Sequence, residues 1–261
     1  RQRQMCIRDR ESYTALHDWS VEQPALFWTA IWEFCGVMGE RGAGPVLVDP
    51  ERMPGARWFP AARLNFAENL LQDSNNPEAL VFWGEDQLKR TVSRAELRRQ
   101  VARFAAALKA EGVVAGDRVA AYLPNLPETV VAMLAAASIG AVFTSASPDF
   151  GVQGVLDRFG QTQPKVLIAS DGYWYNGKAI DIEAKLAALL PQLPSARRTV
   201  LVPYLGEETD ALAARLPGGV SHARFIAPHP AAEPDFAPLP FDHPLYICLL
   251  YTSDAADEED S

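Results

Sequence analysis

The chain has 261 residues, of which 48% are hydrophobic and 22% are charged, and its formal net charge is -9 at pH 7. This balance is that of a globular protein with one large or two moderate domains, and it excludes a disordered or fibrous chain. The acidity argues against a nucleic-acid partner, because proteins that bind nucleic acid carry a clustered basic face. We expect no membrane partner either, since the most apolar stretch, residues 130–146, falls short of the ~20 apolar residues of a membrane helix.

Both ends of the chain differ from the rest, since residues 1–10 are basic and residues 248–261 are acidic. The run CLLYTS that opens the acidic end can be encoded by TGT CTC TTA TAC ACA TCT. The reverse complement of that DNA, read from its third base, encodes MCIRD, which is the sequence of Met5 to Asp9. Such an inverted repeat is typical of read-through into a sequencing adapter, so we expect both ends to be non-native and exclude them from the fold prediction. The alternative is two genuine flexible tails, and the coding DNA distinguishes the two.

Cysteine usage indicates the redox environment. Only Cys35 lies between the two ends, so no internal disulfide is expected there. The sequence contains no CxxC pair, no Cys/His cluster of zinc spacing and no secretory apolar region. A reducing cytoplasm is therefore the expected compartment.

Residues 11–78 form the first segment of the chain, and they have no core pattern of their own. Apolar side chains recur at helical spacing from Pro24 to Met38, behind a proline suited to a first helical turn, and predict an amphipathic helix. Residues 39–60 are rich in Gly and Pro without a period, which predicts an extended arm. A short helix is expected within ARLNFAENLL, residues 62–71.

Regular alternation of strands and helices is predicted over residues 79–247. The runs ALVFW and LKRTVS predict a hairpin, and Ser93 with Glu96 forms a capping box for a helix that Gly112 ends in a left-handed turn. The next expected elements are strands at 117–123, 141–147, 165–170 and 198–203, and helices at 127–140, 152–163 and 181–193. Because several of these strands are continuous apolar runs, they predict an α/β fold with a mostly parallel sheet covered by helices on both faces.

The end of this region is looser. Residues 203–240 are dense in Pro, Gly and Ala and are expected to run over the surface, with one short strand at HARFIA, residues 222–227. The run FDHPLYI, residues 241–247, is then expected to resume an apolar strand of the sheet.

Few residues carry a recognisable catalytic pattern. The sequence has no GxGxxG, GxxxxGK[ST], HExxH or GxSxG motif. Four scattered histidines are interpreted as surface or packing residues: His17, His222, His229 and His243. We therefore assign no catalytic residue and no metal ligand.

Two segments follow neighbouring strands at the sheet edge where open α/β proteins bind ligands. The first is YLPNLPE, residues 122–128, which we interpret as a turn because Asn125 and Pro127 suit one. The second is SPDFG, residues 147–151, whose composition suits a tight turn that a ligand can approach closely. Neither signal is specific by itself.

Four runs carry a family resemblance: LHDWSVEQPALFWTAIWEF, WFPAARLNFAENLL, YLPNLPETVVAMLAAASIGAVFTSASPDFG and FDHPLYI. Over about Ser12 to Ile247 they resemble the acetoacetyl-CoA synthetases of the adenylate-forming acyl-CoA synthetase superfamily. The second run is similar to the N-terminal cap of acetyl-CoA synthetase-like enzymes, and the third is similar to a strand–helix–strand unit of the large adenylation domain. SPDFG, which replaces a glycine-rich counterpart, and the following DGYWYNGK favour acetoacetate as the acid.

The resemblance implies an N-terminal cap at residues 11–78 and the first part of an adenylation domain at residues 79–247. It also implies a parent enzyme that joins acetoacetate to CoA through an acyl-adenylate and uses ATP, Mg²⁺ and CoA. A ligase for another short or medium-chain acid remains an alternative, because the family builds most of its acyl pocket downstream. A non-catalytic CoA- or nucleotide-binding module is a third reading.

The resemblance also locates what this chain lacks and what it holds. In the family, the strand similar to FDHPLYI leads into a Ser/Thr/Gly-rich loop ending in Pro-Lys that holds ATP phosphates, whereas CLLYTSDAADEEDS follows here. We therefore expect an inactive fragment that binds none of these cofactors tightly, and the oligomeric state stays open. By position, Ser147, Pro148 and Asp149 match a loop that approaches CoA, so the resemblance implies a wall of the CoA tunnel there.

Overall fold

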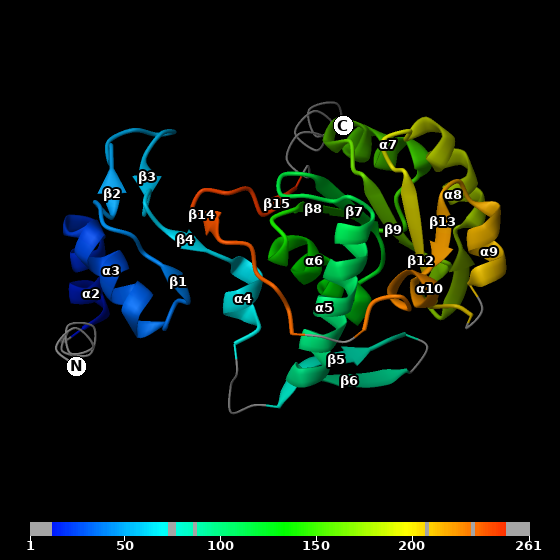
Figure 1. Ribbon diagram of the computed structural model, residues 1–261, viewed down its shortest axis with the longest axis horizontal. Coiled ribbons are helices and arrows are strands. Elements are labelled where there is room, and N and C mark those ends of the chain that lie inside the picture. The colour runs from blue at the N-terminus through cyan, green and yellow to red at the C-terminus, as the bar shows by residue number, and fades with distance from the viewer. Residues whose placement is uncertain (1–11, 73–76, 86–87, 207–208, 231–232, 249–261) are drawn as a thin grey trace. The chain divides into compact units, whose positions relative to one another are not determined.

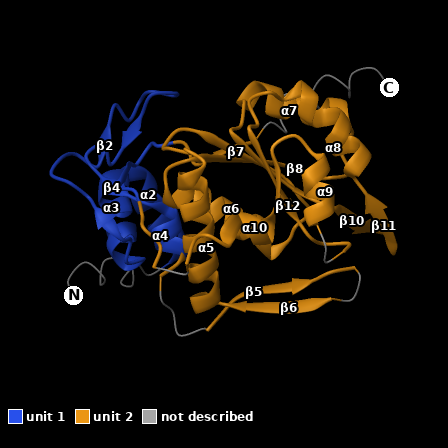
Figure 2. Cartoon of the chain, turned by 45° about the vertical axis from the view of Figure 1, so that its right-hand side comes forward, with its two compact units in different colours: residues 1–70, 237–243 blue, residues 71–236, 244–261 orange. Residues whose placement is uncertain are grey.

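The computed structural model describes residues 12–72, 77–85, 88–206, 209–230 and 233–248. The chain divides into two compact units, residues 1–70 with 237–243 and residues 71–236 with 244–261 (Figure 2). The end expected to be non-native at residues 1–10 lies outside the described residues, as does all of the end at 248–261 except Cys248. Among the helices described, none combines the length and apolar character that a membrane-spanning segment needs.

Two helices open the first unit, α2 (Tyr13–Glu22) and α3 (Pro24–Phe34). The hydroxyl of Ser12 caps α2 by accepting a hydrogen bond from the backbone N–H of Ala15 at 3.2 Å. Pro24 starts α3, as its fixed backbone angle favours, and the ring centroids of Trp19 and Phe27 pack edge to face at 5.3 Å. The sequence predicted α3 but not α2.

The rest of this unit is built from short strands around a short helix. The elements are β1 (Gly39–Glu40), β2 (Leu47–Val48), β3 (Arg57–Trp58), β4 (Arg63–Leu64), α4 (Phe66–Leu70) and β14 (Leu239–Pro240). The fully buried Asn65 caps α4 with its Oδ1, which accepts from the N–H of Ala67 at 2.9 Å, and its Nδ2 donates to the carbonyl of Ala237 at 3.0 Å. One side chain thereby ties residues 237–243 to an N-terminal helix.

The second unit begins with the predicted hairpin, β5 (Glu78–Trp83) and β6 (Lys89–Ser93), followed by α5 (Arg94–Ala110). Ser93 Oγ accepts from the N–H of Glu96 at 3.1 Å, so half of the capping box is confirmed. The carboxylate of Glu96 instead accepts from Arg99 and from Gln100, and these bonds, Gln100 first, lower the pKa of Glu96. Gly112 ends the helix with φ +74°, as predicted.

A six-stranded sheet forms the centre of the second unit (Figure 1). Its strands lie in the order β13-β12-β9-β7-β8-β15, and every neighbouring pair is parallel. The strands are β7 (Arg118–Tyr122), β8 (Val142–Ala146), β9 (Val166–Ser170), β12 (Arg198–Val202), β13 (Gly219–Ser221) and β15 (Tyr246–Ile247). The predicted parallel α/β fold is confirmed.

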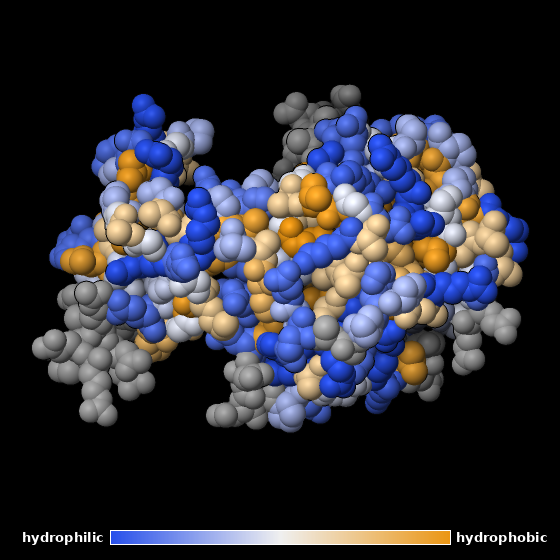
Figure 3. All heavy atoms as spheres, in the orientation of Figure 1, coloured by the Kyte–Doolittle hydropathy of each residue, from blue (hydrophilic) through white to orange (hydrophobic). Residues whose placement is uncertain are grey.

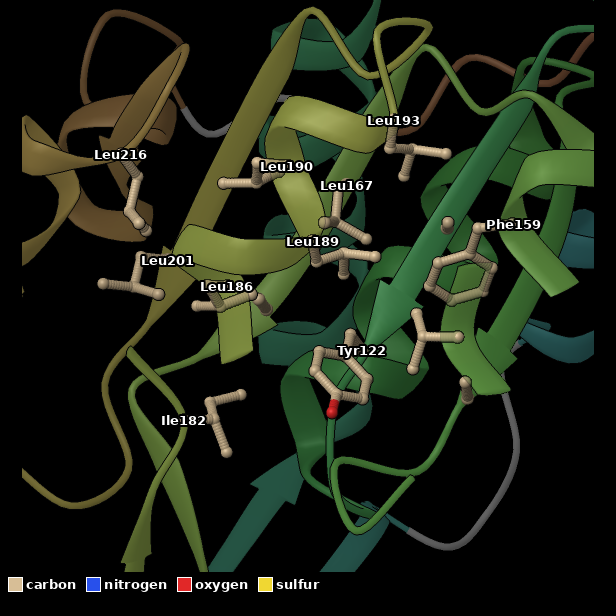
Figure 4. Packing of buried hydrophobic residues seen from close by; sticks show 14 of the residues in the cluster. Tyr122, Phe159, Leu167, Ile182, Leu186, Leu189, Leu190, Leu193, Leu201 and Leu216 are labelled. Atoms are coloured by element: carbon tan, nitrogen blue, oxygen red, sulfur yellow. The ribbon is translucent and has the colours of Figure 1, made fainter. Parts of the chain in front are cut away.

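Helices cover both faces of this sheet. On one face, alternate strand residues such as Ala120, Tyr122 and Leu167 pack against α7 (Val152–Thr162) and α8 (Glu183–Leu189) in a leucine-rich cluster (Figure 4). The intervening strand residues are also buried, and α6 (Pro127–Ser138) lies against β7 and β8 while packing on α5. A 3₁₀ turn, Leu190–Gln192, follows α8.

Two strand predictions need correction, and three further elements of the second unit were not predicted. HARFIA is not a strand: Ser221 caps a helix, α10 (His222–Ile226), and the strand β13 precedes it. Within FDHPLYI only Tyr246–Ile247 pairs with the sheet, because the chain turns at Phe241 and Asp242. The unpredicted elements are the two strands of a hairpin, β10 (Gly172–Tyr175) and β11 (Lys178–Asp181), and the helix α9 (Asp210–Arg215).

Candidate ligand site at the sheet edge

The connections that leave β7 and β8 diverge to opposite faces of the sheet. The chain after β7 enters α6 on the α5 side, whereas the chain after β8 enters α7 on the side of the leucine-rich cluster. Because the two strands are neighbours, a crevice opens between their carboxyl ends. Open α/β sheets bind ligands at such a switch point.

YLPNLPE and SPDFG both lie at this crevice, as the sequence predicted. They line a hollow of about 390 Å³, to which Asn125 and Ser147 contribute polar groups and Phe150 and Tyr246 contribute rings. Behind Asn125, Leu126 and Pro127 are buried and start α6, so this segment also has the turn role that we expected. A hydroxyl pair, Ser145 with Tyr246, closes the side of the hollow next to β15.

The SPDFG loop is a tight turn with alternating exposure. The N–H of Phe150 donates to the carbonyl of Ser147 at 3.2 Å, and Pro148 occupies the second position of the turn, where its fixed φ is favoured. Pro148 is buried, whereas Ser147 and Asp149 are exposed. Of the three residues expected to contact CoA, Ser147 is exposed and lines the hollow, Asp149 is exposed but is not among the lining residues, and Pro148 is buried.

Tyr122 and Lys185 hold this loop from within the protein. The Tyr122 hydroxyl lies 2.7 Å from the carbonyl oxygen of Phe150 and 3.2 Å from that of Pro148. The Lys185 ammonium donates to the carbonyl of Pro148 at 2.8 Å and lies 3.4 Å from that of Phe150. Lys185 was not singled out from the sequence, and Tyr122 was named only as the first residue of YLPNLPE, which we interpreted as a turn.

Electrostatics at the loop favour a neutral tyrosine beneath it. Only 1% of the Tyr122 surface is exposed, and burial, followed by the nearby Tyr173 and Asp149, raises the pKa of Tyr122 to about 12. Burial and Asp149 also raise the pKa of Tyr173. Both hydroxyls thus remain hydrogen-bond donors at neutral pH.

None of the four histidines is among the residues that line the hollow. His222 stacks on Phe104 with ring centroids 5.8 Å apart, and burial lowers its pKa. His17 is exposed on α2, and His229 and His243 lie outside helices and strands. In the part of the chain that the structure describes, no three His, Cys, Asp or Glu side chains gather closely enough to hold a metal ion.

Comparison with known families defines the class of protein. The sequence model described as AMP-binding enzyme matches residues 67–253, and the one described as Acetyl-coenzyme A synthetase N-terminus matches residues 13–70. The chain therefore belongs to the AMP-binding enzyme family. The first match runs past Ile247 into the acidic end, so the non-native origin of residues 248–261 stays a prediction.

The chain is similar to acetoacetyl-CoA synthetases in particular. It is 53% identical to that of Rhizobium meliloti (strain 1021) over 92% of this chain and 36% of the relative, and 40% identical to that of Xenopus tropicalis over 93% and 37%. The solved acetoacetyl-CoA synthetase from Streptomyces lividans superposes with a TM-score of 0.84 and 41% identity, over 94% of this chain and 38% of that one. The chain thus spans about a third of the length of the curated relatives it matches.

Proposed function

We propose that this chain is part of an ATP-dependent acid–thiol ligase that joins acetoacetate to CoA. The observation that carries the proposal is the 53% identity to an acetoacetyl-CoA synthetase across nearly the whole chain. In such a reaction the carboxylate of the acid attacks the α-phosphorus of ATP, releasing pyrophosphate and leaving an acyl-adenylate. The CoA thiol then displaces AMP to form the thioester.

Within that reaction the described residues supply a scaffold and one wall of the CoA path. We place that wall at Ser147, Pro148 and Asp149, because Ser147 and Phe150 of this loop line the hollow of about 390 Å³ at the switch point. The exposed Ser147 hydroxyl can donate to and accept from the amides of a pantetheine chain. These residues fit a neutral, amide-bearing ligand.

The sequence that follows β15 does not fit the triphosphate or its metal. Gripping phosphate needs clustered backbone N–H groups or cations, which stabilise the charge of the transferring phosphorus. The sequence after β15 contains no glycine and no lysine, and it contains five carboxylates, at Asp254, Asp257, Glu258, Glu259 and Asp260. We propose that the 261-residue polypeptide by itself is inactive and binds ATP, Mg²⁺ and CoA only weakly. The proposed compartment of the ligase is the cytoplasm.

Malonamate is a second candidate acid, because a malonamoyl-CoA synthetase is among the relatives of this chain. The chain is 34% identical to a malonamoyl-CoA synthetase of Penicillium aethiopicum over 93% of this chain and 35% of that one. Malonamate differs from acetoacetate by an amino group in place of a methyl group, so the two acids have nearly the same shape. They differ in hydrogen-bonding capacity, which a polar or apolar acyl pocket can distinguish.

Acid choice is tested on the complete reading frame recovered from the source DNA. Purified protein is assayed for AMP release with ATP, CoA and one of three acids: acetoacetate, malonamate or acetate. The proposal predicts the highest kcat/KM with acetoacetate. Higher kcat/KM with malonamate or acetate would reassign the acid, and AMP release that depends on none of the acids would overturn the ligase assignment.

A further inference from the structure

Three successive carbonyl groups of the SPDFG loop converge on the side of the loop that faces the protein. The ammonium of Lys185 lies 2.8, 3.5 and 3.4 Å from the carbonyl oxygens of Pro148, Asp149 and Phe150. The Tyr122 hydroxyl adds a short contact of 2.7 Å to the last of these. An ammonium has three donors and a hydroxyl has one, so together they satisfy the inward face of the turn.

These two donors come from elements that are distant in the sequence. Tyr122 ends β7, and its ring lies at the border of the leucine-rich cluster, with the hydroxyl directed away from Leu189 and Leu193 (Figure 4). Lys185 belongs to α8, which packs into the same cluster through Leu186 and Leu189. The turn is therefore fastened to two rigid elements of one core.

The fastening determines which groups face the crevice. With its carbonyls directed inward and Pro148 buried, the turn presents Ser147 and Asp149 outward. Pro148 also fixes one backbone angle, so this turn lacks the conformational freedom that a glycine pair would have. Pro148 restricts only one angle, so the rest of the conformation of the turn depends on the contacts from Lys185 and Tyr122.

We propose that Lys185 is a positioning residue for the CoA path: with Tyr122, it holds Ser147–Asp149 in the single conformation that lines this path. The inference rests on the proposed function, since the ligand of the turn is CoA only if the chain belongs to an acyl-CoA ligase. Lys185 itself touches the loop and not the ligand. Its three donors are used on backbone carbonyls, and its ammonium nitrogen lies 5.7 Å from the centroid of the Tyr173 ring.

The position of the loop is tested by hydrogen exchange on the 261-residue chain. Lys185→Met keeps the length of the side chain but removes its charge and donors, and Tyr122→Phe removes only the hydroxyl. We expect amide exchange in the peptide covering residues 147–156 to accelerate at least ~10-fold in both variants, because local opening exposes amides of a less constrained loop. Lys185→Arg, which keeps the charge and the donors, should retain slow exchange.

A matched control removes another lysine that pairs outside the loop. Lys109 contacts Asp235 at 2.8 Å, and 47% and 84% of the two side-chain surfaces are exposed. Lys109→Met should leave exchange of residues 147–156 unchanged. Circular dichroism of each variant shows whether it is folded. If Tyr122→Phe does not fold, the partly exposed Lys185 still allows the test.

The functional consequence is tested in a chimera, defined as the Rhizobium meliloti relative with its matched segment replaced by residues 12–247 of this chain. For Lys185→Met we expect the KM for CoA to rise about 5- to 20-fold, whereas acetoacetate-dependent ATP–pyrophosphate exchange, which needs no CoA, stays unchanged. Lys185→Arg should restore most of the CoA affinity. A purely structural defect would lower both half-reactions together.

The outcomes separate this inference from the proposed function. If amide hydrogen exchange of residues 147–156 is unchanged in folded Lys185→Met, the inference is overturned, whatever happens to the KM for CoA. Faster amide hydrogen exchange supports the inference if the KM for CoA rises while ATP–pyrophosphate exchange stays unchanged. Faster amide hydrogen exchange with an unchanged KM for CoA shows that Lys185 holds the turn but that the turn does not line the CoA path. This result overturns both the positioning role and that part of the proposed function.

Discussion

Tyr122 joins the packed core to the candidate site through one hydroxyl. Its ring is buried with the leucines of α8, and its oxygen contacts the loop after β8. A buried hydroxyl that keeps a hydrogen-bond partner stabilises the fold by about 1 kcal/mol, whereas a buried carbonyl left without a donor costs more. The residue therefore contributes to stability and to the shape of the site at once.

Alkaline pH should weaken the protein through Tyr122. Its pKa is raised to about 12 in the folded chain from an ordinary 10, so the unfolded chain loses this proton first. Between these pH values the folded state binds more protons, and the free energy of unfolding falls as pH rises, by roughly 2 to 3 kcal/mol in total. Urea unfolding at a series of pH values from 9 to 11.5 gives the free energy of unfolding of wild type and of Tyr122→Phe. This free energy should fall less steeply with pH in the variant, and an equal pH dependence would contradict the assignment.

Acidic pH should lower the free energy of unfolding through protonation of His222. Burial first, and then the positive charges of Arg103 and Arg90, lower its pKa below the ordinary 6.5, although Glu128 opposes them. A group with a lowered pKa stabilises the fold above its unfolded pKa and loses that contribution as pH falls. Between pH 7.5 and 5 we expect His222→Gln to lose less stability than wild type on acidification. His17→Gln, on an exposed site, is the control and should follow wild type.

Site prediction at this scale was partial for a physical reason. The residues Ser147, Pro148 and Asp149 could be placed at a sheet edge because strand ends and turn residues are local signals. Lys185 lies 37 residues from the carbonyl that it holds, and a single lysine in an amphipathic helix carries no pattern of its own. The assignment of Ser147, Pro148 and Asp149 to the CoA path stays a prediction.

At the scale of elements, the long amphipathic segments were predictable and the short ones were not. The helix α5 follows from its apolar periodicity and its cap, and the central strands follow from continuous apolar runs. HARFIA is too short for a period, and the capping hydroxyl of Ser221 decides its helical state. The hairpin β10–β11 did carry a local signal, because Asn176 and Gly177, both at positive φ, form the two-residue turn that joins paired strands.

Two glycines should respond differently to the same substitution. A Cβ on Gly172, in β10, would overlap the Ile180 carbonyl and the Leu205 side chain. Gly112, in contrast, has open space but φ +74°. We expect Gly112→Ala to cost about 1 kcal/mol through backbone strain and Gly172→Ala about 2 kcal/mol or more through overlap.

Urea unfolding of both variants checks this order, and circular dichroism confirms that each is folded. Gly160, inside α7, gives a reference, because a Cβ there meets nothing within 4 Å and alanine favours a helix interior, so Gly160→Ala should not destabilise the fold. A Gly172→Ala variant as stable as wild type would contradict the close packing of β10.

At the scale of the whole chain, the sheet has an end that is thinly covered. Within the described residues β15 pairs only with β8, through two residues, and 40% of the Tyr246 surface is exposed. On the face drawn in Figure 3, apolar residues lie interspersed with hydrophilic ones. An unpaired parallel strand offers free backbone groups to other molecules.

We therefore expect the 261-residue chain to bind an apolar fluorescent dye and to associate as its concentration rises. Dye titration and light scattering measure both effects. Tyr246→Lys, which places a charge on the edge strand, should reduce association. A monodisperse chain that leaves the dye silent and unfolds cooperatively would contradict this expectation.

The most direct test of the account is acetoacetate-dependent ATP–pyrophosphate exchange, measured side by side on the 261-residue polypeptide and on the chimera that carries residues 12–247. The account predicts exchange by the chimera, because the segment supplies a competent scaffold, and none by the polypeptide, because the sequence printed after β15 has neither the glycines nor the lysine proposed to hold the triphosphate. Exchange by the 261-residue polypeptide alone, or a folded chimera without exchange, would contradict it.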